Sequence, residues 1–157
     1  KTLQEYLILK NYVEDSTTKY RQMSNRFLIQ RDYKAFCVFI VIYLEHWIYS
    51  EVRAHLLAFG KSEEEVEALL IYNDKKGKVR NISREEAIKL ITGDKKFKNS
   101  CEYIDLVDNV FERRDSIVHG RKQDIHKNDA MSVTKTLNKF ISYILREFKT
   151  ALKQKTN

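Results

Sequence analysis

Arg114, Asp115 and His119 are the residues of this chain whose types and spacing best suit catalysis at a phosphate group. Histidine titrates near neutral pH, so His119 can act as a general base or a general acid. Arginine stays charged throughout and can hold two phosphate oxygens through parallel hydrogen bonds. Asp115 can orient either neighbour by hydrogen bonding. These three side chains therefore predict acid–base chemistry beside a fixed positive charge.

Arg114 also stands out because it shares a helical seam with apolar residues. The seam is spaced three or four residues apart and comprises Ile104, Val107, Phe111, Arg114 and Val118. An arginine is costly to bury unless something pairs with it. Three explanations stay open: a helix end that reaches solvent, a carboxylate partner inside the domain, with Glu45 as a candidate, or a position that faces a second subunit and an anionic ligand.

The segment from Glu112 to Gly120 resembles the signature of the HEPN superfamily. That signature is an arginine, a polar residue, a few further residues and a histidine, at the end of a helix in a small helical bundle. Arg114, Asp115 and His119 match it position for position. The apolar pair before the histidine and the glycine after it are also usual. The motif covers six residues, and the resemblance in architecture covers most of the chain.

The resemblance implies an all-α, HEPN-like bundle of about five to six helices that forms a homodimer. Many HEPN proteins cleave RNA without a metal or cofactor, as toxins or in defence against phage. Their active site forms where the arginine and histidine of both subunits converge. The implied activity is an endoribonuclease in which the 2′-OH of RNA attacks the adjacent phosphorus. The implied catalytic residues are Arg114, His119 and Asp115, and an antitoxin protein is a further expected partner.

Two other functions remain open. Some HEPN proteins have lost catalysis, or bind nucleotides or partners, so a non-catalytic dimerisation or binding module is the alternative. A basic helical adaptor unrelated to the superfamily is the third. Geometry bears on the choice, because five positions along an ideal helix rotate a side chain by roughly 140°. Arg114 and His119 then converge only if the helix ends or kinks near Val118, which Gly120 favours, or if they meet across a dimer.

Clusters of basic residues add to the case for an anionic partner. The net charge of +7 indicates such a partner or, equally, a solubilising surface. The residues around His119 that are expected to contact RNA phosphates are Arg113, Arg121, Lys122 and Lys127. A second cluster is either another phosphate-binding patch or a solvated turn, and it contains Lys75, Lys76, Lys78 and Arg80.

The elements that position these residues are predicted to be helices of one domain, 1–157. The chain has no proline and four glycines, which favours long helices. A first segment has helical spacing, and the stretch from Tyr33 to Phe59 is predicted to be the central buried helix. Capping boxes predict three more helix starts, at Ser62, Ser83 and Asn99; the second of these helices ends at Thr92-Gly93. A linker of residues 121–128 precedes a final amphipathic helix, and a hairpin around residues 73–78 is possible.

Several classes of site are not expected. Cys37 and Cys101 resemble small buried hydrophobes of a reducing compartment, and no Cys/His cluster has zinc spacing. The longest apolar run, Ala35 to Leu44, is too short to cross a bilayer, and no signal peptide is visible. A cytoplasmic protein without a membrane partner is therefore expected. The remaining histidines are interpreted as structural or surface residues, namely His46, His55 and His126.

Overall fold

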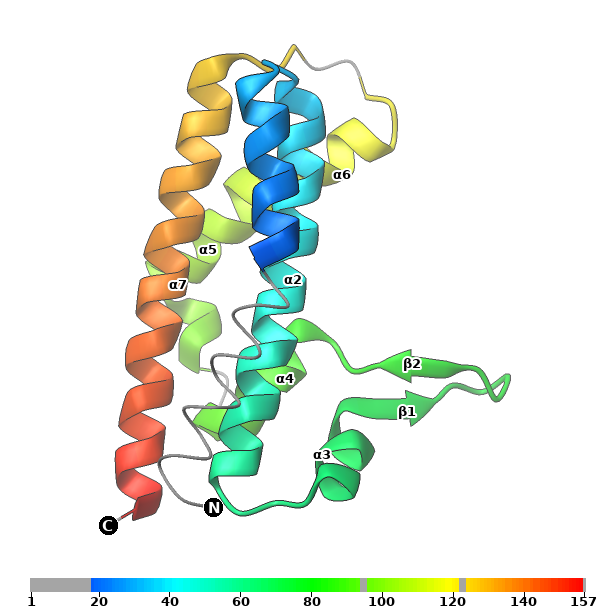
Figure 1. Cartoon of the computed structure of the whole chain (residues 1–157), viewed down its shortest axis with the longest axis vertical. Helices are drawn as coiled ribbons and strands as arrows, with labels where there is room; N and C mark the ends of the chain where they lie inside the picture. The colour runs from blue at the N-terminus through cyan, green and yellow to red at the C-terminus, as the bar shows by residue number, and fades with distance from the viewer. Residues whose placement is uncertain (1–17, 94–95, 122–123, 157) are drawn as a thin grey trace.

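The computed structural model describes residues 18–93, 96–121 and 124–156, and most of them are helical. Figure 1 shows a bundle of long helices with a small hairpin at its side. The predicted mostly helical fold is confirmed for these residues. The part of the first predicted helix that precedes residue 18 lies outside them, and residues 18–29 are helical. The other elements are α2 (Tyr33–Ala58), α3 (Glu63–Leu70), β1 (Ile71–Asn73), β2 (Val79–Asn81), α4 (Arg84–Thr92), η1 (Lys96–Asn99), α5 (Cys101–Asp105), η2 (Leu106–Phe111), α6 (Glu112–Val118) and α7 (Lys127–Thr156).

Helix α2 is the centre of the bundle, as its apolar sequence predicts. Asp32 caps its first turn, where its carboxylate accepts a hydrogen bond from the Ala35 amide. Buried residues follow along its whole length and belong to a single hydrophobic cluster with side chains of α3, α4, α5, η2 and α7. Because α2 is surrounded, it needs no polar face, and its apolar residues extend nearly all round.

Helix α2 is also long and apolar enough to cross a membrane, judged by length and composition alone. The expectation that no segment is long enough to cross a bilayer considered only the ten-residue run from Ala35 to Leu44. The helix that contains this run is longer, so that expectation was based on too short a segment. Apolar residues continue through Trp47 and Ile48 to Leu57, with charged residues between them. In the structure, 56% of the most apolar window of α2 is buried against the rest of the protein. Core helices of bundles pass the same test.

Helix α7 packs along α2 for most of its length (Figure 1). Its buried face repeats every three or four residues, which is the predicted amphipathic pattern. The fully buried members of that face are Ala130, Val133, Phe140, Ile144 and Phe148. This helix begins at Lys127, so it includes the last two residues of the predicted linker.

The segments α5, η2 and α6 form one continuous helical stretch whose middle is a π-helix. In η2 the wider turn is evident where the Glu112 amide donates to the carbonyl of Val107, five residues earlier. The predicted seam from Ile104 to Val118 is wrong, because both of its ends are exposed, at 48% and 60%. The buried face instead comprises Tyr103, Leu106, Val110 and Phe111. A π-turn holds more residues than an α-turn, so the seam loses its phase at this segment.

Local signals predicted most helix ends correctly. The capping box at Ser62 and the cap at Ser83 are present, and Gly93 ends α4 in the left-handed conformation, with φ of 80°. The predicted cap at Asn99 is wrong. Ser100 caps α5 by accepting from the Tyr103 amide at 3.2 Å, while Asn99 ends η1. Two neighbouring residues were both suitable caps, and the sequence alone did not separate them.

The two cysteines differ in environment. Cys37 is buried in α2 as predicted, and burial raises the pKa of its thiol to about 11. Cys101 was expected to be buried but is exposed at the start of α5. Ile104, one turn further along, is exposed on the same side, whereas Tyr103 belongs to the buried face. Both thiols are free.

Candidate active site

The motif residues lie at the end of α6, where the helix is closed by a glycine. His119 is the C-cap, and Gly120 takes a left-handed conformation with φ of 66°. The Gly120 amide donates to the carbonyl of Ile117, and the Arg121 amide donates to that of Ser116. This pair of bonds is a Schellman motif, which needs a residue with positive φ at the position of Gly120. The predicted helix end next to Val118 is confirmed.

Arg114 pairs with carboxylates of its own chain. Its Nε donates to Oδ1 of Asp115 at 2.6 Å, and its guanidinium lies 3.9 Å from Oε1 of Glu45. Of the three explanations for an arginine at this position, the intrachain partner is therefore found, and Glu45 is one of the two partners. The Arg114 side chain retains 23% of its exposed area. It is thus held from inside the fold but still reaches the surface.

A second arginine completes this cluster and was not anticipated. Arg84 donates to Oε1 of Glu45 at 3.0 Å, so one carboxylate oxygen lies between two guanidinium groups. The guanidinium carbon of Arg84 also lies 3.8 Å from the centre of the Phe111 ring, a cation–π contact. Through Glu45, Arg84 and Arg114, the cluster joins α2, α4 and α6.

One sequence signal could have identified Arg84. It directly follows the cap Ser83 and is the first residue of α4. Cations are disfavoured at a helix N-terminus, because the first amides carry partial positive charge. An arginine in that position is therefore disfavoured unless anions lie nearby. Glu85 in the same turn is one such anion, and Glu45 adds a second across 39 residues of sequence.

Glu85 and Tyr103 continue the cluster toward the core. The Tyr103 hydroxyl donates a short hydrogen bond to the Glu85 carboxylate, and Arg84 lies 3.6 Å from the same oxygen. Burial raises the pKa of Glu85, but the bond from Tyr103 and the nearby cations lower it more, so the net pKa lies below 4.5. Burial, followed by the bond to Glu85, raises the pKa of the Tyr103 phenol. The Tyr103 phenol therefore keeps its proton and continues to donate its hydrogen bond to Glu85.

Replacing Tyr103 by phenylalanine should reduce the free energy of unfolding at pH 7 by about 1–2 kcal/mol, because Glu85 loses a donor to its ionised form. A carboxylate with a lowered folded pKa stabilises the fold above its ordinary pKa, and this contribution is lost as the pH falls through the folded value. The difference between wild type and Tyr103→Phe should therefore shrink below pH 4.5. Urea denaturation at several pH values measures it.

The control for this measurement is Tyr72→Phe, which removes a phenol hydroxyl from an exposed tyrosine on the hairpin. Its free energy of unfolding should match that of the wild type at every pH. A Tyr103→Phe difference that stays constant down to pH 3 would show that the Tyr103 hydroxyl stabilises the fold independently of Glu85.

His119 is not brought to Arg114 within one chain. Its side chain is exposed, and in the described part of the chain no hydrogen bond or ion pair joins it to Arg114 or to another residue. It stays close to helical geometry, with φ of −83° and ψ of 9°, so the rotation of roughly 140° along the helix largely persists. Arg114 and His119 do not converge within one chain, so a shared site requires the Arg114 or the His119 of a second subunit.

The predicted RNA-contacting residues have different surroundings. Arg113 is only 22% exposed and has intrachain partners: it pairs with Asp129 at 2.7 Å and donates to the side chain and carbonyl of Asn109. These bonds fasten α6 to α7, and the contact of Arg113 with RNA stays a prediction. Arg121 and Lys127 are exposed, Arg121 two residues after His119 and Lys127 at the start of α7. Lys122 lies outside the described residues.

The other histidines have the structural or surface positions that were expected. His55 is buried in α2, with Nδ1 2.8 Å from the carbonyl of Glu51 and its ring 5.0 Å from that of Phe148. The His46 ring lies 5.0 Å from that of Tyr20 in a tilted contact, and His126 is exposed. In the described ranges, no group of three or more His, Cys, Asp and Glu side chains is arranged to hold a metal ion.

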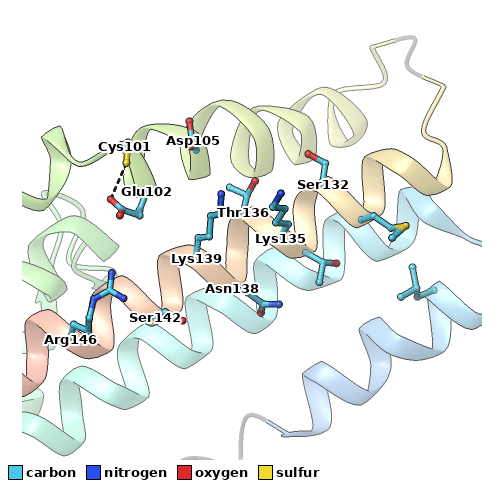
Figure 2. A pocket seen from close by; sticks show the side chains of 13 residues that line it. Cys101, Glu102, Asp105, Ser132, Lys135, Thr136, Asn138, Lys139, Ser142 and Arg146 are labelled. Carbon is cyan, nitrogen blue, oxygen red and sulfur yellow. Dashed lines mark hydrogen bonds between the residues drawn. The ribbon is translucent and has the colours of Figure 1, made fainter.

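A groove on another face contains none of the predicted site residues. It has a volume of about 950 Å³ and lies between α5 and α7 (Figure 2). Lys135, Lys139 and Arg146 line it from α7, opposite Glu102 and Asp105 of α5. Basic and acidic side chains thus both line this groove, whereas the Arg114 cluster lies between α2, α4 and α6. The groove is therefore separate from the candidate site.

Comparison with known proteins adds no identification. No protein-family model, curated protein or solved structure matches this chain. The case for a function therefore depends on the motif at the end of α6 and on the charged cluster behind it.

Proposed function

We propose that this protein is a HEPN-like, metal-independent endoribonuclease that acts as a homodimer. One observation carries the proposal: Arg114 is held at the surface by Glu45 and Asp115, next to a helix end at which His119 is exposed. A guanidinium fixed by carboxylates is pre-organised for phosphate, and an exposed imidazole is accessible to a proton donor or acceptor. These are the two groups that the sequence motif supplies.

Arg114 retains donors for a substrate despite its partners. A guanidinium has five N–H groups, and the contact with Asp115 uses the one on Nε. The 3.9 Å approach to Glu45 is an ion pair without a close hydrogen bond. The terminal nitrogens of Arg114 therefore remain available for two phosphate oxygens. Glu45 and Asp115 act as positioning residues in this arrangement, and Arg84 shares the Oε1 atom of Glu45 with Arg114.

The proposed reaction uses the 2′-OH of RNA as nucleophile. One His119 removes the 2′-OH proton while the 2′-oxygen forms a bond to the adjacent phosphorus. The bond from phosphorus to the 5′-oxygen breaks, and the His119 of the second subunit donates a proton to that oxygen. Arg114 stabilises the negative charge that develops on the phosphoryl oxygens. The products are a 2′,3′-cyclic phosphate and a 5′-hydroxyl.

The surface around the motif supports a dimer. Val118 is 60% exposed, one turn beyond Arg114, and Ile42 is 38% exposed, one turn from Glu45. Both residues therefore lie within about one turn of the Glu45–Arg114 pair. Apolar side chains beside polar site residues are typical of surfaces that a partner covers. A second copy would bring another His119 to this face.

The proposed biological role follows from the superfamily resemblance alone. We propose a cytoplasmic toxin or antiviral nuclease, restrained by a separate antitoxin chain. RNA cleavage that halts growth needs such restraint.

A non-catalytic HEPN-like module that dimerises or binds a nucleotide or protein is the second candidate. The observation in its favour is that Glu45 and Asp115 already compensate the charge of Arg114 within one chain. An arginine in this position has a structural role even without substrate. Oligomeric state and catalysis must therefore be measured separately.

The test of the proposed activity is cleavage of a 20-nucleotide RNA by the purified protein in EDTA. We expect cleavage with 2′,3′-cyclic phosphate ends, and no cleavage of the same RNA carrying 2′-O-methyl groups throughout. The methylated RNA is the control, because its 2′-oxygen has no proton to lose. If neither RNA is cut while light scattering shows a dimer, the binding-module function replaces the enzymatic one. Cutting of both RNAs would exclude the 2′-OH mechanism.

A further inference from the structure

The hairpin formed by β1 and β2 projects from the bundle and buries little (Figure 1). Its strands pair in antiparallel register, with Tyr72 opposite Arg80 and Asn73 opposite Val79. Tyr72 is 48% exposed and Val79 is 64% exposed. An isolated two-stranded hairpin is marginally stable in water. The chain therefore maintains an exposed hairpin that contributes almost nothing to the core.

The turn of this hairpin is ordered by a single carboxylate. Asp74 accepts hydrogen bonds from the amides of Lys76 and Lys78, each at 2.9 Å, and from Nε of Arg80 at 2.8 Å. Gly77 completes the turn with φ of 73°. The bond from Arg80, followed by that from the Lys78 amide, lowers the pKa of Asp74. The one acidic group of the turn is thus used to fix its backbone.

The lysines of the turn are left without acidic partners in the described structure. Lys75, Lys76 and Lys78 are exposed, and no ion pair to a described residue involves them. With Arg80 they give residues 74–80 four cations and one carboxylate. A basic and exposed ribbon with an aromatic side chain on one strand is suited to a nucleic acid backbone and to stacking on a base.

The base of the hairpin is anchored beside the candidate active site. The carbonyl of Ile82, just after β2, accepts a short hydrogen bond from the Tyr49 hydroxyl. Tyr49 lies one turn after Glu45 on α2, and Arg84 follows Ile82 by two residues. The hairpin therefore leaves the bundle next to the cluster of Glu45, Arg84 and Arg114.

We propose that this hairpin is a second contact for RNA, where Lys75, Lys76 and Lys78 bind backbone phosphates and Tyr72 stacks on a base. The inference rests on the proposed function for the identity of its ligand. Each strand residue advances the chain by roughly 3.3 Å, so the turn lies on the order of 15 Å from the base of the hairpin. The RNA bound there is a single-stranded segment several nucleotides from the bond that is cut.

The test measures binding of a fluorescent 20-nucleotide RNA with 2′-O-methyl groups, which is not cut, by anisotropy across a salt series. The variant is Lys75→Gln/Lys76→Gln/Lys78→Gln. The matched control is Lys135→Gln/Lys139→Gln/Lys149→Gln, which removes the same charge from exposed positions of α7. We expect the hairpin variant to bind about tenfold more weakly or worse, and its log–log salt slope to fall by about 2, because each lost phosphate contact on a single strand removes about 0.7. The control should stay within about twofold of wild type.

Stacking is tested separately with Tyr72→Ala and Tyr72→Phe. The alanine variant should lose roughly 5- to 100-fold in affinity, while phenylalanine should retain it, because the ring and not the hydroxyl stacks. Equal weakening in the hairpin variant and the α7 control, or no weakening in the hairpin variant, overturns the proposal, as does a wild type that does not bind this RNA. Binding without cleavage of unmodified RNA would retain the hairpin contact and refute the nuclease, so the two failures are distinguishable.

Discussion

His119→Ala should reduce the rate of RNA cleavage in EDTA by about 10²–10⁴-fold, the usual contribution of a positioned general acid or base. The exposed imidazole at the end of α6 is the group that the proposed mechanism uses to move both protons. Because the side chain makes no hydrogen bond within the described structure, its removal should leave the fold intact. The melting temperature of the variant should therefore equal that of the wild type, and the lost activity can be assigned to chemistry.

His126→Ala is the matched control for this loss. His126 is also an exposed histidine, seven residues further along the chain and outside α6. Its substitution should leave the cleavage rate within about twofold of wild type, as expected for a surface change away from the reaction. If His119→Ala retains full activity, His119 is not the acid or base. Equal losses in both variants would instead indicate that exposed imidazoles near the loop act only through RNA binding.

Phe140→Ala should destabilise the protein by about 3–5 kcal/mol, because a fully buried aromatic ring leaves a cavity in the middle of α7. The Phe140 ring lies 6.1 Å from that of Tyr103, so its loss also loosens α5 against α7. For a chain of this size each kcal/mol corresponds to about 2–4 °C, so the melting temperature should fall by roughly 6–20 °C. Urea denaturation and calorimetry measure the change.

Leu145→Ala provides the comparison on the same helix. Leu145 is 37% exposed, five residues after Phe140, and its truncation should cost less than about 1 kcal/mol. Similar losses for the two variants would mean that the buried face of α7 is not the one described. The pair therefore tests the packing of α7 independently of any function.

The long elements were predictable because their signals are local and repeated. Helix α2 combines a long apolar stretch with a glycine just past its end, and α3 and α4 begin at serine caps whose partner amides lie three residues away. The amphipathic pattern of α7 repeats over several turns. Each of these signals depends on residues close together in sequence, so none requires knowledge of the tertiary structure.

The stretch from Cys101 to Val118 was predicted as a helix, but its buried face was not. The period of 3.6 residues is assumed whenever a face is assigned from spacing, and η2 breaks it between Leu106 and Phe111. The sequence also did not identify Tyr103 as a core residue, because a buried phenol needs a hydrogen-bond partner, which Glu85 provides in the fold. Neither the π-turn nor the contact between Glu85 and Tyr103 can be read from the local spacing of apolar residues.

The candidate site was predictable in part. The pairing of Glu45 with Arg114 followed from the cost of an uncompensated arginine, but that argument did not reveal that Glu45 is shared with Arg84. Arg113 seemed a free basic residue because its partner Asp129 lies beyond the loop that follows α6. Charge in a sequence indicates neither which cations are already paired nor which remain available to a ligand.

The π-helical segment has a consequence for how this site is oriented. In an α-helix each residue turns the side chain by about 100°, so one residue accommodated in η2 rotates all that follows by roughly that angle without shifting the axis. The helix from Cys101 to Val118 is thereby divided into two independently oriented halves. The first directs apolar side chains at α7, and the second directs Arg114 at α2. The number of residues in η2 therefore sets the angle between the face that packs on α7 and the face that carries Arg114. Deletion of the exposed Asp108 would uncouple Arg114 from Glu45 while removing no residue from the core.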